Sequence, residues 1–241
     1  MSHMKKAQEL VGWAASKIGC GYLFGDNGQP ITEELIQAKA RQYPGLYTSS
    51  YIRRCRKWIG NKDEQGNLLP GFDCSGLIDV FLGVDLNAKG YYANAVTKGK
   101  MGSFPASIPG VLLFKAGWDG IIDHVGISDG KGSMIEAKGV DYGVVKTELA
   151  GSGWDFWAYC HLLDFTSDLG PTPEVVPGIR LGERGQRVKW LQTALNLKGY
   201  GLKVDGIFGP ATHAAIRHFQ GKNGLKVDEI CGPKTAAKLT E

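Results

Sequence analysis

The sequence lacks the patterns that would assign it to several common classes of protein. It contains no apolar stretch long enough to cross a membrane, so we expect no membrane insertion. It has no Walker loop, no dinucleotide fingerprint, and no His-Glu-x-x-His or Cys-x-x-Cys motif. The net charge of +4 is far from the dense basic stripe that nucleic-acid binding requires. We therefore expect a globular protein without a nucleic-acid partner, a metal or another cofactor.

Cysteines are few, and their arrangement does not predict disulfides. Their number is odd and no two are closely spaced, so they do not form a recognisable disulfide framework. We expect four of them to be free thiols of a reducing compartment, and one, Cys74, to be a nucleophile. The five are Cys20, Cys55, Cys74, Cys160 and Cys231.

Cys74 and His124 lie in two separate segments whose residues suit nucleophilic catalysis. Cys74 follows Asp73, and the apolar residues after it recur at helical spacing, which predicts that the sulfur lies in the first turn of a helix. A thiol attacks well only as the thiolate, so it needs an imidazole to take its proton. The alternative is that Cys74 is a small buried hydrophobe and His124 a satisfied core histidine.

Glu136 is the predicted partner of His124. Residues 125–128 and 133–137 alternate like short strands, and the Asp-Gly-Lys-Gly segment between them predicts a hairpin turn. An odd-numbered loop centred on Gly130 would place His124 directly opposite Glu136, on the same face of the sheet. The carboxylate could then accept the Nδ1 hydrogen and stabilise the imidazolium. The alternative is a surface glutamate at a strand end.

The Asp-Cys-Ser-Gly-Leu run and the later His-Val-Gly-Ile resemble the NlpC/P60 family of peptidoglycan hydrolases. Tyr22 and the Pro-Gly before residue 111 also match its pattern, and the resemblance covers roughly residues 7–165. It implies a papain-like α+β fold, with an antiparallel sheet and packed helices. It also implies catalysis by Cys74, His124 and Glu136, although many relatives have histidine at the third position. The substrate-binding residues that it implies are Tyr22, Asp73 and Ser75.

Residues 26–70 are an insertion relative to the compact pattern of this family. Thr32 is a predicted helix N-cap, because acidic residues follow it in a first helical turn. Residues 53–58 form a basic cluster around Cys55. The cluster is either a wall of the substrate groove or a solvated charged face, and we favour the latter.

The composition changes after Phe165. Residues 166–178 are rich in proline and predict a semi-rigid linker. Residues 179–241 contain an internal repeat, since 202–212 recur as 225–235, and in each copy a Gly-Pro pair marks a helix start. The pattern predicts a small all-α, three-helix domain. It resembles the helical peptidoglycan-binding domain, over about residues 179–239.

These features together predict a two-domain peptidoglycan hydrolase, with the catalytic domain at residues 5–165. The first resemblance implies cleavage of the stem peptide between γ-D-glutamate and the diamino acid. The alternatives are muramoyl-L-alanine amidase activity on the same scaffold, or a non-catalytic protein that binds the cell wall. In each case the expected partner is bacterial peptidoglycan.

The N-terminal segment bears on where the protein acts. Met1-Ser2-His3 resembles a vector-derived remnant, so we expect the native start at Met4. The residues from Leu10 to Ile18 predict one stripe of an amphipathic helix and not the apolar core of a signal peptide. We expect synthesis in the cytoplasm without a signal peptide and release to the wall as with phage endolysins. The alternative is a secreted protein whose natural signal sequence was removed.

Overall fold

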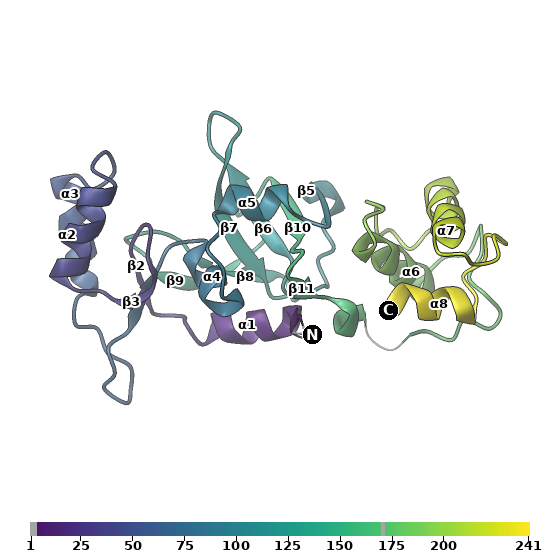
Figure 1. Cartoon of the computed structure of the whole chain (residues 1–241), viewed down its shortest axis with the longest axis horizontal. Helices are drawn as coiled ribbons and strands as arrows, with labels where there is room; N and C mark the ends of the chain where they lie inside the picture. The colour runs from purple at the N-terminus through teal and green to yellow at the C-terminus, as the bar shows by residue number, and fades with distance from the viewer. Residues whose placement is uncertain (1–3, 170–171) are drawn as a thin grey trace.

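The computed structural model describes residues 4–169 and 172–241. The vector-like residues Met1-Ser2-His3 and positions 170–171 of the expected linker lie outside the described residues. Figure 1 shows an elongated molecule. At one end lie α2 (Glu33–Gln42) and α3 (Ser49–Cys55), and at the other lie α6 (Gln186–Leu197), α7 (Pro210–Lys222) and α8 (Pro233–Thr240). No described helix combines the length and the apolar character needed to cross a bilayer.

A six-stranded antiparallel sheet forms the centre of the N-terminal lobe, in the order β5-β10-β6-β7-β8-β9. Helices α1 and α5 pack on it, while α4 packs against α1 and β3. A core of buried apolar side chains fills the space between these elements. The predicted α+β architecture is confirmed. The strands are β5 (Thr97–Lys100), β6 (Leu112–Ala116), β7 (Ile122–Ser128), β8 (Ser133–Ala137), β9 (Val144–Glu148) and β10 (Phe156–Tyr159); the helices are α1 (Ala7–Ala15), α4 (Gly76–Leu82) and α5 (Ala88–Ala93).

Two small sheets and two short 3-10 helices complete this lobe, and a third 3-10 helix, η3, contacts the first helix of the C-terminal domain. The parallel pair β1-β11 joins the start of the lobe to its end, and the sheet β2-β4-β3 leads into Cys74. These elements are β1 (Lys5–Lys6), β2 (Gly21–Tyr22), β3 (Asn27–Pro30), β4 (Pro70–Phe72), β11 (Leu163–Asp164), η1 (Arg56–Trp58), η2 (Met101–Ser103) and η3 (Thr166–Leu169).

The first helix follows the predicted amphipathic stripe only in part. Leu10, Val11 and Ala14 are buried as expected. The helix ends at Ala15, and Ile18, which lies beyond it, is 46% exposed. The stripe is therefore shorter than the sequence predicted, because the chain turns away before Ile18 reaches the core.

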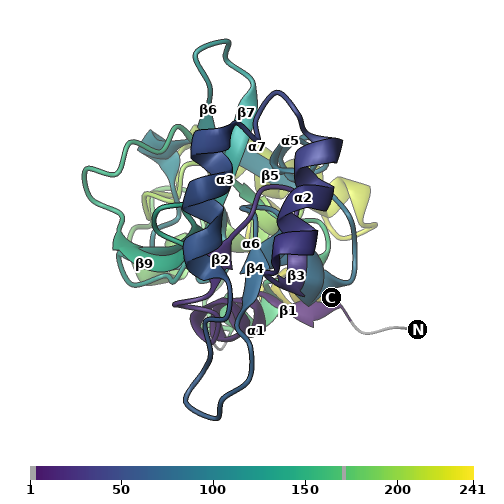
Figure 2. The ribbon, with the colours of Figure 1, turned by 90° about the vertical axis from the view of Figure 1, so that its left-hand side faces the viewer.

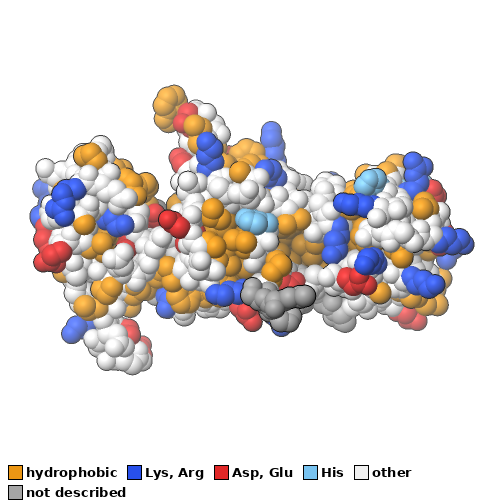
Figure 3. All heavy atoms as spheres, viewed as in Figure 1, with side chains coloured by type: hydrophobic (Ala, Val, Ile, Leu, Met, Phe, Trp, Pro, Cys, Tyr) orange, Lys and Arg blue, Asp and Glu red, His pale blue; other side chains and the backbone are white. Residues whose placement is uncertain are grey.

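The insertion packs on a second, smaller core, to which Leu23 and Val140 contribute from outside it. This core lies at the end of the molecule that faces the viewer in Figure 2 and is at the left in Figures 1 and 3. The insertion forms α2 (Glu33–Gln42) and α3 (Ser49–Cys55). The Thr32 hydroxyl accepts the amide hydrogen of Leu35 at 3.1 Å, so the predicted N-cap is confirmed. The buried apolar residues of this smaller core are Leu23, Ile31, Ile36, Tyr47, Cys55 and Val140.

The C-terminal domain contains the predicted three helices, α6 (Gln186–Leu197), α7 (Pro210–Lys222) and α8 (Pro233–Thr240). Proline stands at the first position of α7 and α8, where no amide hydrogen is needed. Val175, from the proline-rich segment, is buried in the same core as these helices. That segment therefore contributes to the packing of the C-terminal domain as well as joining the lobes.

The internal repeat produces two equivalent buried hydrogen-bond clusters. The Gln192 side-chain amide donates to the Asp205 carboxylate at 2.9 Å and to the Thr212 hydroxyl at 3.2 Å. In the second copy Gln220 makes the same contacts with Asp228 at 2.9 Å and Thr235 at 3.2 Å. Each glutamine carbonyl also accepts one turn amide, so these side chains fix the two turns before α7 and α8.

Candidate active site

Cys74 lies between β4 and α4, in a turn that Asp73 closes. The Asp73 carboxylate accepts hydrogen bonds from the Gly76 amide at 2.6 Å, the Ser75 hydroxyl at 3.1 Å and the Gly25 amide at 2.9 Å. Since α4 begins at Gly76, the sulfur precedes the first turn of this helix. The sequence had predicted that it lies within that turn. Asp73 acts as the cap of this turn.

The environment of Cys74 disfavours a free thiolate. Burial and, to a smaller extent, the nearby charge of Asp73 raise the pKa of the thiol to about 12, although the backbone N–H groups of Val125 and Ser75 act in the opposite direction. Sγ lies 4.0 Å from the carbonyl oxygen of Asp123. Cys74 therefore faces the residues on either side of His124, and it needs a base to lose its proton near neutral pH.

His124 and Glu136 form the predicted pair. Nε2 of His124 lies 2.7 Å from Oε2 of Glu136, and the glutamate side chain is only 3% exposed. The Thr147 hydroxyl donates to the other carboxylate oxygen at 3.0 Å. Burial alone would raise the pKa of Glu136, but the hydrogen bonds and charge of His124 and the bond from Thr147 outweigh it and lower the pKa. Glu136 is therefore an anion that orients the imidazole.

The register of the β7-β8 hairpin differs from the expected one. The pairs are Ile127 with Ile135 and Ser128 with Met134, so the loop is centred on Lys131 and not on Gly130. Continuing this register places Gly126 opposite Glu136, and His124 is a diagonal neighbour of the glutamate. His124 and Glu136 still make contact because the expected and observed loops both have an odd number of residues. An odd loop keeps the two side chains on one face of the sheet, and a diagonal pair of long side chains can reach each other there.

The ring nitrogen that contacts the carboxylate also differs from the predicted one. Glu136 contacts Nε2, whereas the sequence reasoning assigned Nδ1 to that role. Nδ1 of His124 is therefore the nitrogen left to exchange a proton with a thiol.

Two further residues, which the sequence analysis did not single out, pack around His124. The Trp154 ring stacks on the imidazole with centroids 5.5 Å apart and an angle of 21°. Lys115 of β6 pairs with His124 across the sheet, and its Nζ lies 4.9 Å from the centroid of Trp154. The glycines at 117 and 120 indicate a turn between β6 and β7, and this turn could have predicted that Lys115 pairs with His124. No sequence signal linked Trp154 to this site, because it follows β9.

Of the expected substrate-binding residues, Tyr22 lies near the sulfur. Burial raises the pKa of its hydroxyl, and the nearby Cys74 and Asp73 raise it further. Ser75 is buried and donates to Asp73. The contacts of Asp73 and Ser75 shown here are within the protein, so contact of Tyr22, Asp73 and Ser75 with a substrate stays a prediction.

A buried carboxylate lies behind this turn. Asp26 is completely buried; its backbone oxygen accepts the amide hydrogen of Asp73 at 3.0 Å, and its Oδ2 has no hydrogen-bond partner within the described residues. Burial raises the pKa of Asp26 to about 7, against the opposing charge of Lys39.

The basic cluster of the insertion is largely paired with acidic groups of the chain. Arg56 lies 2.7 Å from the Glu33 carboxylate, and Arg54 forms an ion pair with Asp141. Lys57 donates to the backbone oxygen of Asp141 at 2.6 Å. These contacts support the interpretation as a solvated charged face, because the charges are already compensated.

Within the described residues no cluster of three His, Cys, Asp or Glu side chains is arranged to hold a metal ion. His213 pairs with Glu229 at 2.8 Å, and His218 accepts or donates a hydrogen bond with the Tyr200 hydroxyl at 2.9 Å. All five cysteines are free thiols; Cys74 is half-buried, and the other four are fully buried.

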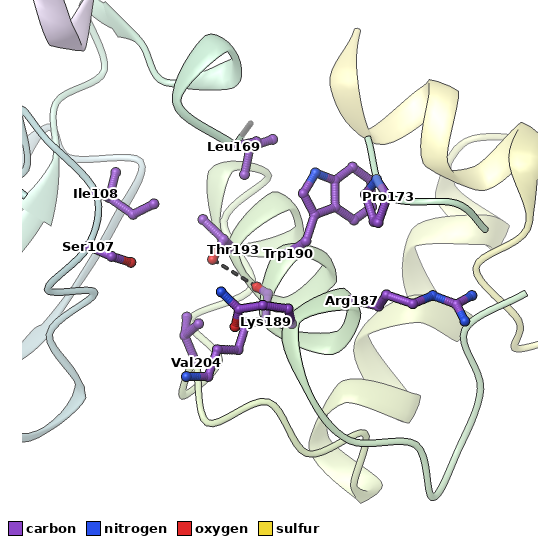
Figure 4. Close-up of a pocket in the computed structure, with 10 residues that line it drawn as sticks. Ser107, Ile108, Leu169, Pro173, Arg187, Lys189, Trp190, Thr193 and Val204 are labelled. Carbon is purple, nitrogen blue, oxygen red and sulfur yellow. Dashed lines mark hydrogen bonds between the residues drawn. The ribbon is translucent and has the colours of Figure 1, made fainter. Parts of the chain in front are cut away.

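A separate cleft of about 380 Å³ lies between the two lobes (Figure 4). Ser107 and Ile108 line it from the N-terminal lobe, and Trp190 and Thr193 of α6 line it from the other side. Its lining includes none of Cys74, His124 and Glu136. The cleft is therefore not the candidate active site.

Two family profiles match the chain. Residues 57–162 match the NlpC/P60 family, and residues 184–239 match the family described as "Putative peptidoglycan binding domain". No curated protein matches.

Several solved structures resemble parts of the chain. The SleB N-terminal domain is 45% identical over 26% of this chain and 92% of its own, with a TM-score of 0.25. A peptidoglycan-binding protein from Clostridioides difficile is 27% identical over 48% of this chain, which spans 57% of that protein, with a TM-score of 0.26. The NlpC/p60 domain of the peptidoglycan hydrolase SagA is 23% identical over 64% of this chain and 97% of its own, with a TM-score of 0.36.

Proposed function

Because the chain belongs to the NlpC/P60 family and ends in a peptidoglycan-binding domain, we propose that it is a cysteine peptidase that cleaves an amide bond in the peptidoglycan stem peptide. The observation that carries this proposal is the Glu136–His124 hydrogen bond of 2.7 Å, formed beside the backbone that Cys74 faces. A buried anion, an imidazole with one free nitrogen and a thiol are the parts that acyl transfer to cysteine requires.

The proposed reaction begins when His124 Nδ1 takes the proton of Cys74 and the sulfur attacks the amide carbonyl carbon. The imidazolium that forms is stabilised by Glu136, which lies on the opposite side of the ring. Backbone N–H groups near Cys74, together with the Tyr22 hydroxyl, meet the developing oxyanion. The C–N bond then breaks as His124 returns the proton to the leaving amine, and water hydrolyses the thioester.

We assign the scissile bond to γ-D-glutamyl-diamino acid, which follows from the family resemblance, with muramoyl-L-alanine cleavage as the competing bond. The C-terminal domain would hold the enzyme on the wall. As part of the same proposal, the protein reaches the wall after release from the cytoplasm, as an endolysin does.

The test is to digest peptidoglycan of known composition and identify the released fragments by mass spectrometry. We expect new amine ends on the diamino acid and free γ-carboxyl groups on D-glutamate. Cys74→Ala should lower the rate by at least about a thousandfold, whereas Cys160→Ala, at a buried thiol remote from the motif, should remain active. Free L-alanine amino ends would instead show amidase activity, and undiminished hydrolysis by Cys74→Ala would refute the mechanism.

A further inference from the structure

Lys115 stands next to the proposed general base. Lys115 and His124 are directly paired across β6 and β7, so their side chains leave the same face of the sheet, with Cβ atoms about 4.5 to 5.5 Å apart. The Lys115 side chain is only half-buried. Its ammonium group is therefore at the edge of the site and accessible to a substrate.

Trp154 holds this ammonium in place. Trp154 is only 7% exposed, and its ring stacks on the imidazole of His124. The centroid of the same ring lies 4.9 Å from Lys115 Nζ. The ring packs against β7 where residue 126 has no side chain, since a Cβ on Gly126 would lie 2.8 Å from it. The position of Lys115 relative to His124 is therefore set by a packed ring.

Lys115 has no counter-charge within the described part of the chain. No carboxylate lies within ion-pair distance of Nζ, and Nζ donates no hydrogen bond there. The nearby Asp155 carboxylate accepts the amide hydrogen of Ala116 at 3.0 Å. By contrast, Arg54, Arg56 and Lys146 each form an ion pair.

Without a bound anion, the unpaired ammonium of Lys115 disfavours proton transfer from Cys74 to His124. His124 becomes positively charged when it takes the thiol proton, and a neighbouring ammonium group repels that charge. An anion that arrives with the substrate would remove this repulsion and would be attracted to both groups.

We propose that Lys115 is a specificity-determining residue that binds a carboxylate of the stem peptide beside the scissile amide. The proposal rests on the proposed function. We assign a carboxylate as the group that binds Lys115, because the stem peptide carries carboxylates next to its amide bonds. The Lys115 ammonium, which lies over the Trp154 ring, is a point charge that a carboxylate can approach.

The test uses two soluble stem peptides, identical except that the carboxylate next to the scissile bond is free in one and a carboxamide in the other. The wild type should prefer the free carboxylate by about tenfold in kcat/KM, which corresponds to about 1.4 kcal/mol. Lys115→Gln should lose this preference: it should slow cleavage of the carboxylate peptide, and it should not slow cleavage of the carboxamide peptide, because it also removes the repulsion of the His124 imidazolium. Lys115→Arg should keep the preference. Lys17→Gln is the matched control, because Lys17 Nζ also lies over a tryptophan, 4.2 Å from the centroid of Trp13.

An equal loss on both peptides, or a preference that survives in Lys115→Gln, would overturn the assignment of Lys115. Failure of the wild type to cleave either peptide at the assigned bond would instead count against the proposed function. The two failures are therefore distinguishable.

Discussion

Both lobes bury a polar side chain in a hydrogen-bond cluster, but the clusters differ in what they leave free. In the C-terminal domain, Gln192 uses its amide hydrogens and its carbonyl on neighbouring groups of the same domain. In the N-terminal lobe, Glu136 holds one nitrogen of His124 and leaves the other without a bond to the carboxylate.

This difference separates a structural network from a chemical one. A fully satisfied amide fixes a turn, and the repeat of the same cluster around Gln220 shows that its role is independent of position in the domain. A carboxylate and an imidazole that keep one reactive nitrogen near Cys74 can instead move a proton. The groups with the clearest catalytic potential accordingly lie in the N-terminal lobe.

The strongest test of this comparison is to disrupt each cluster. His124→Ala should reduce hydrolysis of a soluble stem peptide by about a thousandfold, because no base remains. Glu136→Ala should have a smaller effect, and Glu136→Gln a smaller one still, since an amide oxygen can accept the hydrogen of Nε2. Steady-state kinetics would measure this order.

Gln192→Ala serves as the matched change in the other lobe. It should destabilise the C-terminal domain by about 2 kcal/mol while leaving kcat on the soluble peptide unchanged. Equal activity for all Glu136 variants would mean that Glu136 does not orient His124.

Separating the lobes should sharpen the comparison further. A fragment that ends near residue 170 contains Cys74, His124 and Glu136, and should cleave soluble peptides at close to the full-length rate. On intact sacculi it should be slower by about a hundredfold, because it loses the effective concentration that tethering provides.

The complementary fragment should begin at residue 172, because Val175 belongs to its core. It should pellet with sacculi and hydrolyse nothing. If it stays in the supernatant and the truncated enzyme lyses sacculi normally, the C-terminal domain is not the wall anchor.

Asp26 predicts a pH dependence specific to the N-terminal lobe. Burial raises the pKa of Asp26 to about 7 in the folded state, from its ordinary value of 3.8. The proton that it holds stabilises the fold at low pH, and this contribution is lost as the pH rises through about 7. Between pH 6 and 8 the free energy of unfolding should fall by about 1.4 kcal/mol.

Asp26→Asn should remove this slope, because its side chain does not titrate and its amide oxygen can still accept the Asn27 amide hydrogen, as Oδ1 does at 3.0 Å. Urea unfolding across this pH range would measure it. An unchanged slope in Asp26→Asn would assign the dependence to another group.

The smallest expected effect lies within the C-terminal repeat. Glu229 adopts a φ of 62°, where the first copy has Gly206 at 74°. A left-handed backbone strains a residue with a side chain, so Glu229→Gly should stabilise the domain by about 0.5 to 1 kcal/mol. The loss of the half-exposed hydrogen bond with His213 subtracts little from this gain.

Gly206→Ala is the reciprocal control and should destabilise the domain, because its Cβ would lie 3.0 Å from the Lys189 side chain. Thermal unfolding of the C-terminal fragment would measure both changes. Destabilisation by Glu229→Gly would show that the hydrogen bond with His213 outweighs the backbone strain.

Local patterns in the sequence were sufficient to predict many elements of this protein. The helix N-cap at Thr32, the proline-started helices of the repeat and the two family resemblances depend on residues close together in the chain, where backbone preferences act. The shared face of His124 and Glu136 followed from the period of two along a strand, although the exact pairing did not.

Tertiary structure alone decided how these residues meet. The β7-β8 register is centred on Lys131, and the His124 ring is oriented so that Nε2 meets Glu136. The stacking of Trp154 on His124, and the burial of Asp26 behind Asp73, join segments that are distant in sequence. Such contacts depend on how the sheet and the irregular segments pack in three dimensions, and no local preference of the chain encodes them.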